Sequence, residues 1–216
     1  MKVTLLHSTP LWVAAQAIRT CWDSHDKSDT PLGSVGAGPK DKVLIDRVGN
    51  KFKHASTLEH LVYSFKIEGV SRALLQELAR HRIASLSVKS TRYTLKELKD
   101  EEPFITFMEI AWERVKKYLV LTSHPDVNFA SVITLDGVRR MLTNGISNDV
   151  AKYCLPESYK TELTWTINAR SLQNFLHLRT DKSALWEIRD LANTVFEALP
   201  ADHKYLFEGS LKNAKV

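Results

Sequence analysis

Cysteine is scarce in this chain: its 216 residues include two, Cys21 and Cys154. They are far apart and lack the short spacing of metal-binding or redox pairs, which argues against a disulfide framework and a cysteine-ligated metal. We expect both to be free, buried thiols in a reducing compartment. His54 and His60 are six residues apart, so they do not share a helical face as a metal-binding pair would, and we predict no metal site.

Long apolar runs are also missing. No stretch approaches the roughly 20 apolar residues that a membrane-spanning helix needs, and the apolar run at residues 1–6 is too short for a secretory signal. These absences predict a cytoplasmic protein with no membrane partner. Hydrophobic residues make up 44% and charged residues 25% of the chain, as in ordinary globular proteins. A net charge of +5 suits anionic ligands but does not by itself indicate nucleic-acid binding.

Glycine is sparse as well, and three of the eight glycines fall within residues 30–41. This segment invites comparison with a phosphate-binding loop. However, Pro39 interrupts the required order of glycines, lysine and hydroxyl residue, and no predicted strand leads into it. A mobile surface loop is therefore the better interpretation.

Apolar periodicity predicts alternating strands and helices. Strict alternation over 61–68 places Leu61, Tyr63, Phe65 and Ile67 on one buried face of a strand. Further strands are predicted over 3–6 and 162–168, and helices over 11–22, 71–82, 107–121, 127–142, 168–179, 184–199 and 202–211, with Ser71 and Asn168 as caps. No repeat or linker is visible. We predict one domain over 1–216, of the α/β (α+β) class, with a mixed, largely antiparallel sheet flanked by helices.

One segment, Arg80–Tyr93, contains no acidic residue but is rich in basic residues and serines. A basic residue at a helix C-terminus interacts favourably with the helix dipole and stabilises the helix by about 0.3–1 kcal/mol. This effect would explain the presence of Arg80, His81 and Arg82. The dipole does not explain the serines and Arg92 that follow. Arginine binds phosphate bidentately and stacks on flat rings. The residues themselves therefore indicate an anionic ligand, and leave open whether it is a nucleotide, a cofactor or a nucleic acid.

The order of residues in this segment resembles a known signature. Arg80, His81 and Arg82, followed after seven residues by Ser90, resemble the motif of the flavin-dependent thymidylate synthases, and Ser85 and Arg92–Tyr93 extend the match. The segment His54–His60 is similar to the family sequence upstream of the motif. Asn168–Arg179, followed by Trp186–Glu187, resembles the second family signature. The resemblance covers nearly the whole chain.

The resemblance implies a methyltransferase of nucleotide biosynthesis that makes dTMP from dUMP. It implies methylenetetrahydrofolate as carbon donor, FAD as redox carrier and NADPH as reductant. It also implies a homotetramer with active sites shared between subunits and no nucleic-acid partner. The residues that it assigns to FAD are Ser56, Arg80, His81, Arg82, Val88, Asn168, Arg170 and Asn174. Those that it assigns to dUMP are Glu77, Arg80, Val88, Lys89, Ser90, Arg92, Lys152 and Arg179.

The resemblance also makes Arg179 the catalytic residue, because it matches the arginine that polarises the uracil ring through N3. A positive group beside N3 and O4 stabilises an enolate-like form and raises the electron density at C5. Arginine suits this role because it does not lose its proton. Neither cysteine lies in a motif that would support thiolate addition to the ring. Whether Ser90 is a nucleophile or orients dUMP stays open; we favour orientation, because no base partner is evident.

Three positions depart from the family pattern. Ser87 stands where many members have asparagine, Lys152 where arginine is usual, and Ser183 where histidine is frequent. A lysine in place of an arginine replaces a planar fork with a point charge. Two rival functions remain: a nucleic-acid-binding protein that uses residues 80–92, and a flavoprotein of similar fold that has lost methyl transfer. Against the first, basic residues elsewhere are mixed with acids, as in Lys96–Glu101.

Overall fold

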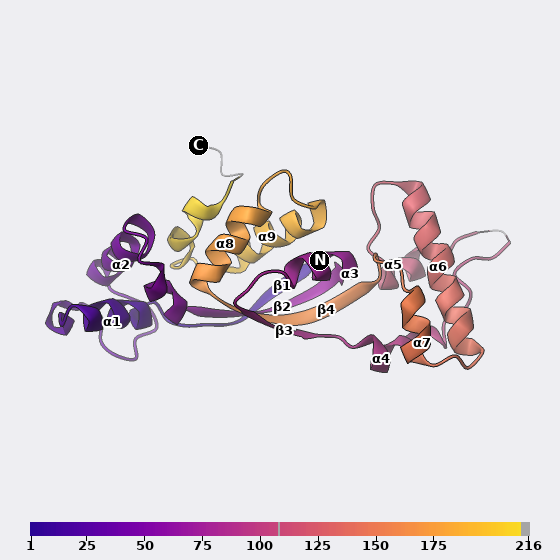
Figure 1. Cartoon of the computed structure of the whole chain (residues 1–216), viewed down its shortest axis with the longest axis horizontal. Helices are drawn as coiled ribbons and strands as arrows, with labels where there is room; N and C mark the ends of the chain where they lie inside the picture. Colours follow the sequence, from indigo (N-terminus) through magenta and orange to yellow (C-terminus); the bar gives the residue numbers. More distant parts are fainter. Residues whose placement is uncertain (108, 213–216) are drawn as a thin grey trace. The chain divides into compact units, whose positions relative to one another are not determined.

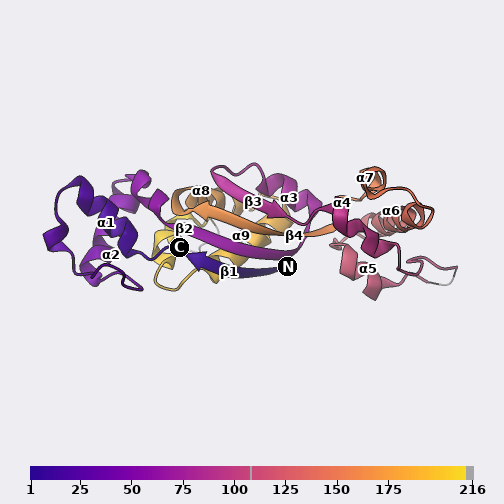
Figure 2. The same ribbon diagram turned by 90° about the horizontal axis from the view of Figure 1, so that it is seen from below.

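A four-stranded antiparallel sheet organises the chain. The computed structural model describes residues 1–107 and 109–212. The strands are β1 (Lys2–Ser8), β2 (Val62–Ser71), β3 (Ala84–Val88) and β4 (Lys160–Asn168), in the order β1-β2-β4-β3 (Figure 2). The central strands β2 and β4 are the two that strict alternation predicts. The predicted combination of a largely antiparallel sheet with flanking helices is confirmed.

Helices α8 (Ala169–Arg179) and α9 (Trp186–Ala198) lie over one face of this sheet, and α9 packs against β1 (Figure 1). The segments that cross from strand to strand carry the other helices. They are α1 (Trp12–Cys21), α2 (Pro39–Ile45), α3 (Arg72–Leu78), α4 (Thr91–Thr94), α5 (Trp112–Tyr118), α6 (Pro125–Thr143) and α7 (Asn148–Ala151). A π-helical segment, η2 (Asp46–Lys51), and a 3-10 segment, η3 (Ala55–His60), precede β2.

The chain divides into two compact units. Unit 1 comprises Met1–Ile67, Glu77–Leu86 and the chain from Thr164 onward, and unit 2 comprises Glu68–Gln76 and Ser87–Leu163. Strands β2, β3 and β4 contribute residues to both units. The single domain over 1–216 stays a prediction, and each unit is described here by itself.

The core of unit 1 forms between the sheet and α8. Tyr63, Phe65 and Trp165 point from neighbouring strands into this layer, and all three are fully buried. The Trp165 ring lies 6.1 Å from Phe65 and 4.9 Å from Phe175 of α8, between ring centroids. Aromatic side chains each bury about 150–250 Å² and favour such tilted contacts. The alternation in β2 and β4 is therefore what fixes the sheet against α8.

Unit 2 has its own apolar core, built around α5 and α6. Its buried residues include Leu95, Leu98, Phe104, Val115, Tyr118, Val132, Leu135 and Val138. The carboxylate of Asp136 on α6 accepts a hydrogen bond from the backbone N–H of Phe104 (3.0 Å) and another from Arg139 (3.0 Å). This buried carboxylate joins the loop before α5 to α6.

Both predicted helix caps are present. The Ser71 hydroxyl accepts a hydrogen bond from the Leu74 N–H (3.0 Å), and the Asn168 side chain accepts one from the Ser171 N–H (2.9 Å). Each bond satisfies a backbone donor that the first helical turn leaves without a partner. The starts of α3 and α8 are thus set by their own sequences.

Several helix predictions were wrong in extent. Helix α3 ends at Leu78 and not at Arg82. Helix α5 covers 112–118 and not 107–121; within that predicted range, Met108 lies outside the described residues. The predicted helix over 202–211 is two 3-10 turns, Lys204–Leu206 and Glu208–Ser210. Glycine at 209 disfavours a continuous helix there.

Other features were not anticipated. Strand β3 and helix α2 were absent from the prediction, and α2 begins with Pro39, a favourable first helical residue. Cys21 and Cys154 are both free, but they are exposed, so the prediction that they are buried was wrong. Cys21 is the last residue of α1, and Cys154 ends a 3-10 turn. Among the described residues, no helix combines the length and apolar character needed to cross a bilayer.

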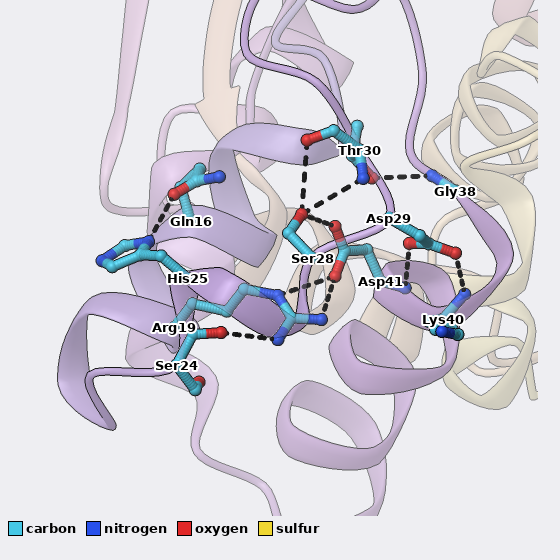
Figure 3. Close-up of polar contacts among 10 residues, drawn as sticks. All are labelled: Gln16, Arg19, Ser24, His25, Ser28, Asp29, Thr30, Gly38, Lys40 and Asp41. Carbon is cyan, nitrogen blue, oxygen red and sulfur yellow. Dashed lines mark hydrogen bonds and ion pairs between the residues drawn. The ribbon is translucent and has the colours of Figure 1, made fainter.

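A buried ion pair anchors the segment between α1 and α2 (Figure 3). Arg19 of α1 donates from Nε to Asp41 of α2 (2.8 Å) and also binds the same carboxylate oxygen through Nη2. The second carboxylate oxygen accepts a hydrogen bond from Ser28 (2.6 Å). Arg19 Nη1 donates to the Ser24 carbonyl (3.0 Å). Asp41 is fully buried and Arg19 is 5% exposed, so this network replaces water around two charges.

The start of α2 is fixed by a carboxylate from an earlier part of the loop. Asp29 accepts hydrogen bonds from the backbone N–H groups of Lys40 (2.8 Å) and Asp41 (3.1 Å) (Figure 3). The Gly38 N–H donates to Thr30 Oγ1 (2.8 Å), which closes the loop between residues 30 and 38. The predicted surface loop over 30–41 thus ends at Gly38, where α2 takes over.

Gly38→Ala is expected to destabilise the protein by about 1–3 kcal/mol, the usual cost of overpacking. A Cβ at Gly38 would lie 2.5 Å from Asp29 Cγ and 2.8 Å from the Asp29 backbone oxygen. Asp29 has little freedom to retreat, because its carboxylate is bonded to the start of α2. Thermal or urea unfolding measures the change. The matched control is Gly137→Ala in α6, where a Cβ would have no neighbour within 4 Å; it should stabilise by about 0.5–1 kcal/mol. Equal effects of both substitutions would contradict this account.

Candidate functional site

Arg179, the last residue of α8, is held by two residues near the end of α3. Its Nη1 lies 2.9 Å from Glu77 Oε2, and its Nε donates to His81 Nε2 at 2.8 Å. A third, longer bond runs from Nη2 to the Glu77 carbonyl (3.4 Å). The Arg179 side chain is 17% exposed and that of Glu77 is 39% exposed. All three guanidinium nitrogens therefore have partners within unit 1, and a largely buried cation is placed beside a carboxylate.

His81 is neutral in this arrangement. Only an unprotonated Nε2 can accept a hydrogen bond from a guanidinium, which has no acceptor of its own. Burial of the imidazole, together with the Arg179 charge, lowers the pKa of His81 to about 4, although Glu77 acts in the opposite direction. The ring is 7% exposed and meets Phe175 edge-on, with ring centroids 5.0 Å apart. At neutral pH the proton of His81 is therefore on Nδ1.

The basic triplet follows α3 in a turn rather than completing the helix. The His81 N–H donates to the Leu78 carbonyl (3.0 Å), and Arg80 and Arg82 are exposed. Helix-end complementation therefore does not account for their charges. The Ile83 N–H donates to the Ser171 hydroxyl (3.2 Å) in the first turn of α8. This contact joins the basic turn to the helix that carries Arg170, Asn174 and Arg179.

A hollow of about 400 Å³ in unit 1 is lined by residues of α1, η3 and α8. Ser56 and Arg170, both assigned to FAD by the family resemblance, line it, and Arg170 is paired with Glu59 at 2.7 Å. Trp22, Lys53 and Cys21 also line the hollow, and the sequence analysis did not predict them as site residues. Trp22 directly follows α1, and its indole is exposed and lines the hollow. The hollow offers a flat aromatic surface, hydroxyls and cations.

A second group of predicted residues lies in unit 2. Arg92 of α4 makes a two-point ion pair with Asp149 of α7, with Nε–Oδ1 at 2.8 Å and Nη2–Oδ2 at 3.4 Å. Asn148 donates to the Arg92 carbonyl (2.7 Å). Lys89 is paired with Glu97 at 3.2 Å. Lys152 follows α7 directly and lies near the Tyr153 ring (6.0 Å to its centroid). Helices α4 and α7 thus bring Arg92 and Lys152 into one part of the unit.

The predicted FAD residues belong to unit 1, except Val88. The predicted dUMP residues are divided: Glu77, Arg80 and Arg179 belong to unit 1, and Val88, Lys89, Ser90, Arg92 and Lys152 belong to unit 2. Among the described residues, no hydrogen bond joins the Ser90 hydroxyl to a basic side chain. Within that same part of the chain, no group of three or more His, Cys, Asp and Glu side chains is placed to hold a metal ion.

Comparisons with known proteins agree on one family. A sequence model described as "Thymidylate synthase complementing protein" matches residues 4–202. The flavin-dependent thymidylate synthase of Wolinella succinogenes is 68% identical over 207 residues, which span 96% of this chain and 97% of that protein. The enzyme of the same name from Helicobacter pylori is 56% identical over 214 residues, covering 99% and 100%. A crystal structure of thymidylate synthase X from Helicobacter pylori with FAD and dUMP superimposes with a TM-score of 0.91, covering 99% and 100% at 56% identity.

Proposed function

The chain belongs to the flavin-dependent thymidylate synthase family, and from this premise we propose how its residues serve the reaction. The protein methylates dUMP reductively to dTMP, with 5,10-methylenetetrahydrofolate as carbon donor and NADPH as reductant. One observation in the structure carries the assignment of roles: a largely buried arginine, Arg179, is fixed beside the Arg80–Arg82 turn. A permanent cation there suits the activation of a uracil ring.

Arg179 would place its positive charge beside N3 and O4 of the dUMP base. Uracil C5 is a weak nucleophile, and a cation beside these atoms stabilises the electron-rich form that C5 attack requires. Ser90 would orient the nucleotide, in line with the lack of a basic partner for its hydroxyl among the described residues. The chain thus needs no cysteine nucleophile.

The residues assigned to FAD fit a flavin nucleotide. Arg80 and Arg82 are exposed cations, and Ser56 and Arg170 line a hollow with an aromatic wall at Trp22. Phosphates suit arginine forks, and flat rings stack on indole and guanidinium groups. When bound, FAD supplies the hydride that no side chain can deliver. The family resemblance assigns it to Ser56, Arg80, His81, Arg82, Val88, Asn168, Arg170 and Asn174.

The dUMP phosphate and sugar would be bound by Arg92, Ser90 and Lys152, with Lys89 and Val88 beside them. Asp149 already occupies one edge of the Arg92 fork. No ion pair involves Lys152 in the described part of the chain. Lys152 is therefore the cation of this group that a phosphate reaches without displacing a carboxylate.

Lys152→Ala is expected to raise the KM for dUMP by about 10-fold or more, the loss of one charged hydrogen bond, with a small change in kcat. Lys152→Arg should have a KM for dUMP equal to or lower than that of wild type, because the guanidinium binds phosphate at two points. Steady-state kinetics at fixed ionic strength measures both. An unchanged KM in Lys152→Ala would remove this residue from the dUMP site.

The quaternary state and location are also part of the proposal. The family resemblance supports a homotetramer whose sites take residues from more than one subunit. Residues of units 1 and 2 that serve one site could then come from different copies of the chain. A cytoplasmic location agrees with the use of dUMP, NADPH and reduced folate, which are metabolites of the cell interior. Light scattering on the purified protein measures the assembly.

The direct test is formation of dTMP. Purified protein should be yellow, and it should oxidise NADPH and form dTMP when dUMP and methylenetetrahydrofolate are both present. Flavin reduction without dTMP would favour a flavoprotein that has lost methyl transfer. A colourless protein that FAD does not reconstitute, and that retards an oligonucleotide with a steep salt dependence, would favour the nucleic-acid alternative.

A further inference from the structure

Glu77 and His81 lie on one short stretch of chain, and both side chains contact the Arg179 guanidinium. Glu77 is in the last turn of α3, and His81 is in the turn that follows. Arg179 comes from a different element, α8, 98 residues further along the chain than His81. One short segment thus supplies every partner that the structure gives to the Arg179 guanidinium.

These contacts use three of the N–H donors of the Arg179 guanidinium. The group has five N–H donors. One on Nε is used by His81, one on Nη1 by the Glu77 carboxylate, and one on Nη2 by the Glu77 carbonyl. One N–H remains on Nη1 and one on Nη2. These two donors are left for acceptor atoms of a bound ligand.

The two side chains that contact Arg179 differ in burial. His81 is buried, and Phe175 supports its ring edge-on. The charged groups that act on it are Arg179 and Glu77, while Phe175 contributes an apolar contact. Because the side chain of Glu77 is 39% exposed, solvent weakens its ion pair, and a planar ligand can approach from that side.

We infer that Glu77 and His81 are positioning residues that fix the Arg179 guanidinium for the uracil ring, with His81 acting as a neutral acceptor. The inference rests on the proposed function and adds to it. It changes the role of His81, which the family resemblance implies as a flavin contact, and it gives Glu77 a task beyond lining the dUMP site. Neither residue needs to touch dUMP to act in this way.

The test compares conservative with truncating variants at each position. His81→Ala and Glu77→Ala are expected to lower kcat for dTMP formation by about 10- to 100-fold, the range for the loss of one hydrogen bond to a charged group. His81→Gln and Glu77→Gln keep an acceptor oxygen for Arg179, and they should retain kcat within about fivefold of wild type. The dUMP dissociation constant, measured by equilibrium titration of the holoenzyme, should change by less than about threefold, because a misplaced transition-state group lowers kcat rather than binding.

FAD content and the unfolding temperature distinguish this role from others. FAD content should match wild type in all four variants, and the unfolding temperature of the two glutamine variants should stay close to that of wild type. The matched controls are His177→Ala, an exposed histidine on α8, and Gln76→Ala, the exposed neighbour of Glu77; both should keep full activity. A His81→Ala protein that loses FAD and recovers activity with added FAD would overturn the inference in favour of a flavin contact. Equal losses in the alanine and glutamine variants would also overturn it.

The failure of this inference is separable from the failure of the proposed function. If the wild-type protein forms no dTMP, the proposed function fails. If wild type forms dTMP and the His81 and Glu77 variants match His177→Ala, the function stands and the positioning roles are wrong.

Discussion

Replacing Arg179 with alanine is expected to lower kcat for dTMP formation by about 10²- to 10³-fold while FAD stays bound. The magnitude is typical of the loss of one preorganised group that stabilises developing charge. The substitution removes the cation and also leaves the Glu77 carboxylate facing the base without a partner. A carboxylate beside O4 opposes the electron-rich form of uracil, so the two effects act in the same direction.

The measurement is single-turnover formation of dTMP with saturating dUMP and methylenetetrahydrofolate, together with the absorbance of bound flavin. Arg179→Lys is the matched control, because it keeps a positive charge but loses the planar fork. We expect its activity to fall between those of wild type and Arg179→Ala. Retained turnover in Arg179→Ala would show that another group activates the ring.

Replacing Asp41 with alanine is expected to reduce the free energy of unfolding by about 3–5 kcal/mol, the cost of breaking a buried ion pair. Arg19 would remain buried at 5% exposure with its charge uncompensated. Ser28 would also lose its acceptor at 2.6 Å, and the first turn of α2 would lose its contact with α1. A loss of this size is a large part of the stability of a typical domain.

Chemical denaturation at neutral pH measures this loss. Glu197→Ala, which breaks an ion pair with Lys204 whose side chains are 72% and 26% exposed, serves as the control. It should change stability by less than about 1 kcal/mol. If Asp41→Ala costs no more than Glu197→Ala, the buried pair does not hold the segment between α1 and α2.

The same carboxylate predicts a pH dependence. Burial alone would raise the pKa of Asp41, but hydrogen bonds from Ser28 and Thr30 and the Arg19 charge outweigh it and lower the pKa below the ordinary value of 3.8. A group whose pKa is lowered by folding stabilises the protein above its unfolded pKa. The stabilising contribution of Asp41 should therefore be complete above about pH 5 and be lost as the pH falls below 3.8 through the lowered pKa.

The sequence predicts best those features that are local and periodic. The alternation of Leu61, Tyr63, Phe65 and Ile67 predicts a buried strand face, and all four are fully buried. Asn168 predicts the start of α8 because capping involves residues only three positions apart. Strand β3 escaped prediction although Ala84, Leu86 and Val88 alternate with two serines, because five residues without a fully buried side chain give only a short period. A short period is weak evidence for a strand.

The candidate site shows the same limit. The family signatures bring Glu77, His81 and Arg179 to the substrate and cofactor, but nothing local indicates that they bind one another across about a hundred residues. The Arg19–Asp41 ion pair likewise could not be predicted from the sequence, because no local pattern distinguishes Asp41 from an ordinary surface acid near a glycine-rich loop. Pairings between distant residues depend on the packing of α1 on α2 and on the contact of Glu77 and His81 with Arg179, which the sequence does not display as a pattern.

The two exposed thiols give the native chain a chemical handle in each unit. Cys21 belongs to unit 1 and Cys154 to unit 2, and both are free. Dyes or spin labels attached to them would report the separation of the two units in solution without any substitution. Because Cys21 also lines the hollow beside Ser56 and Arg170, a ligand seated there should slow its alkylation while Cys154 reacts at an unchanged rate. The alkylation rate of Cys21 would therefore report whether the hollow is occupied, and the rate of Cys154 would serve as the internal reference.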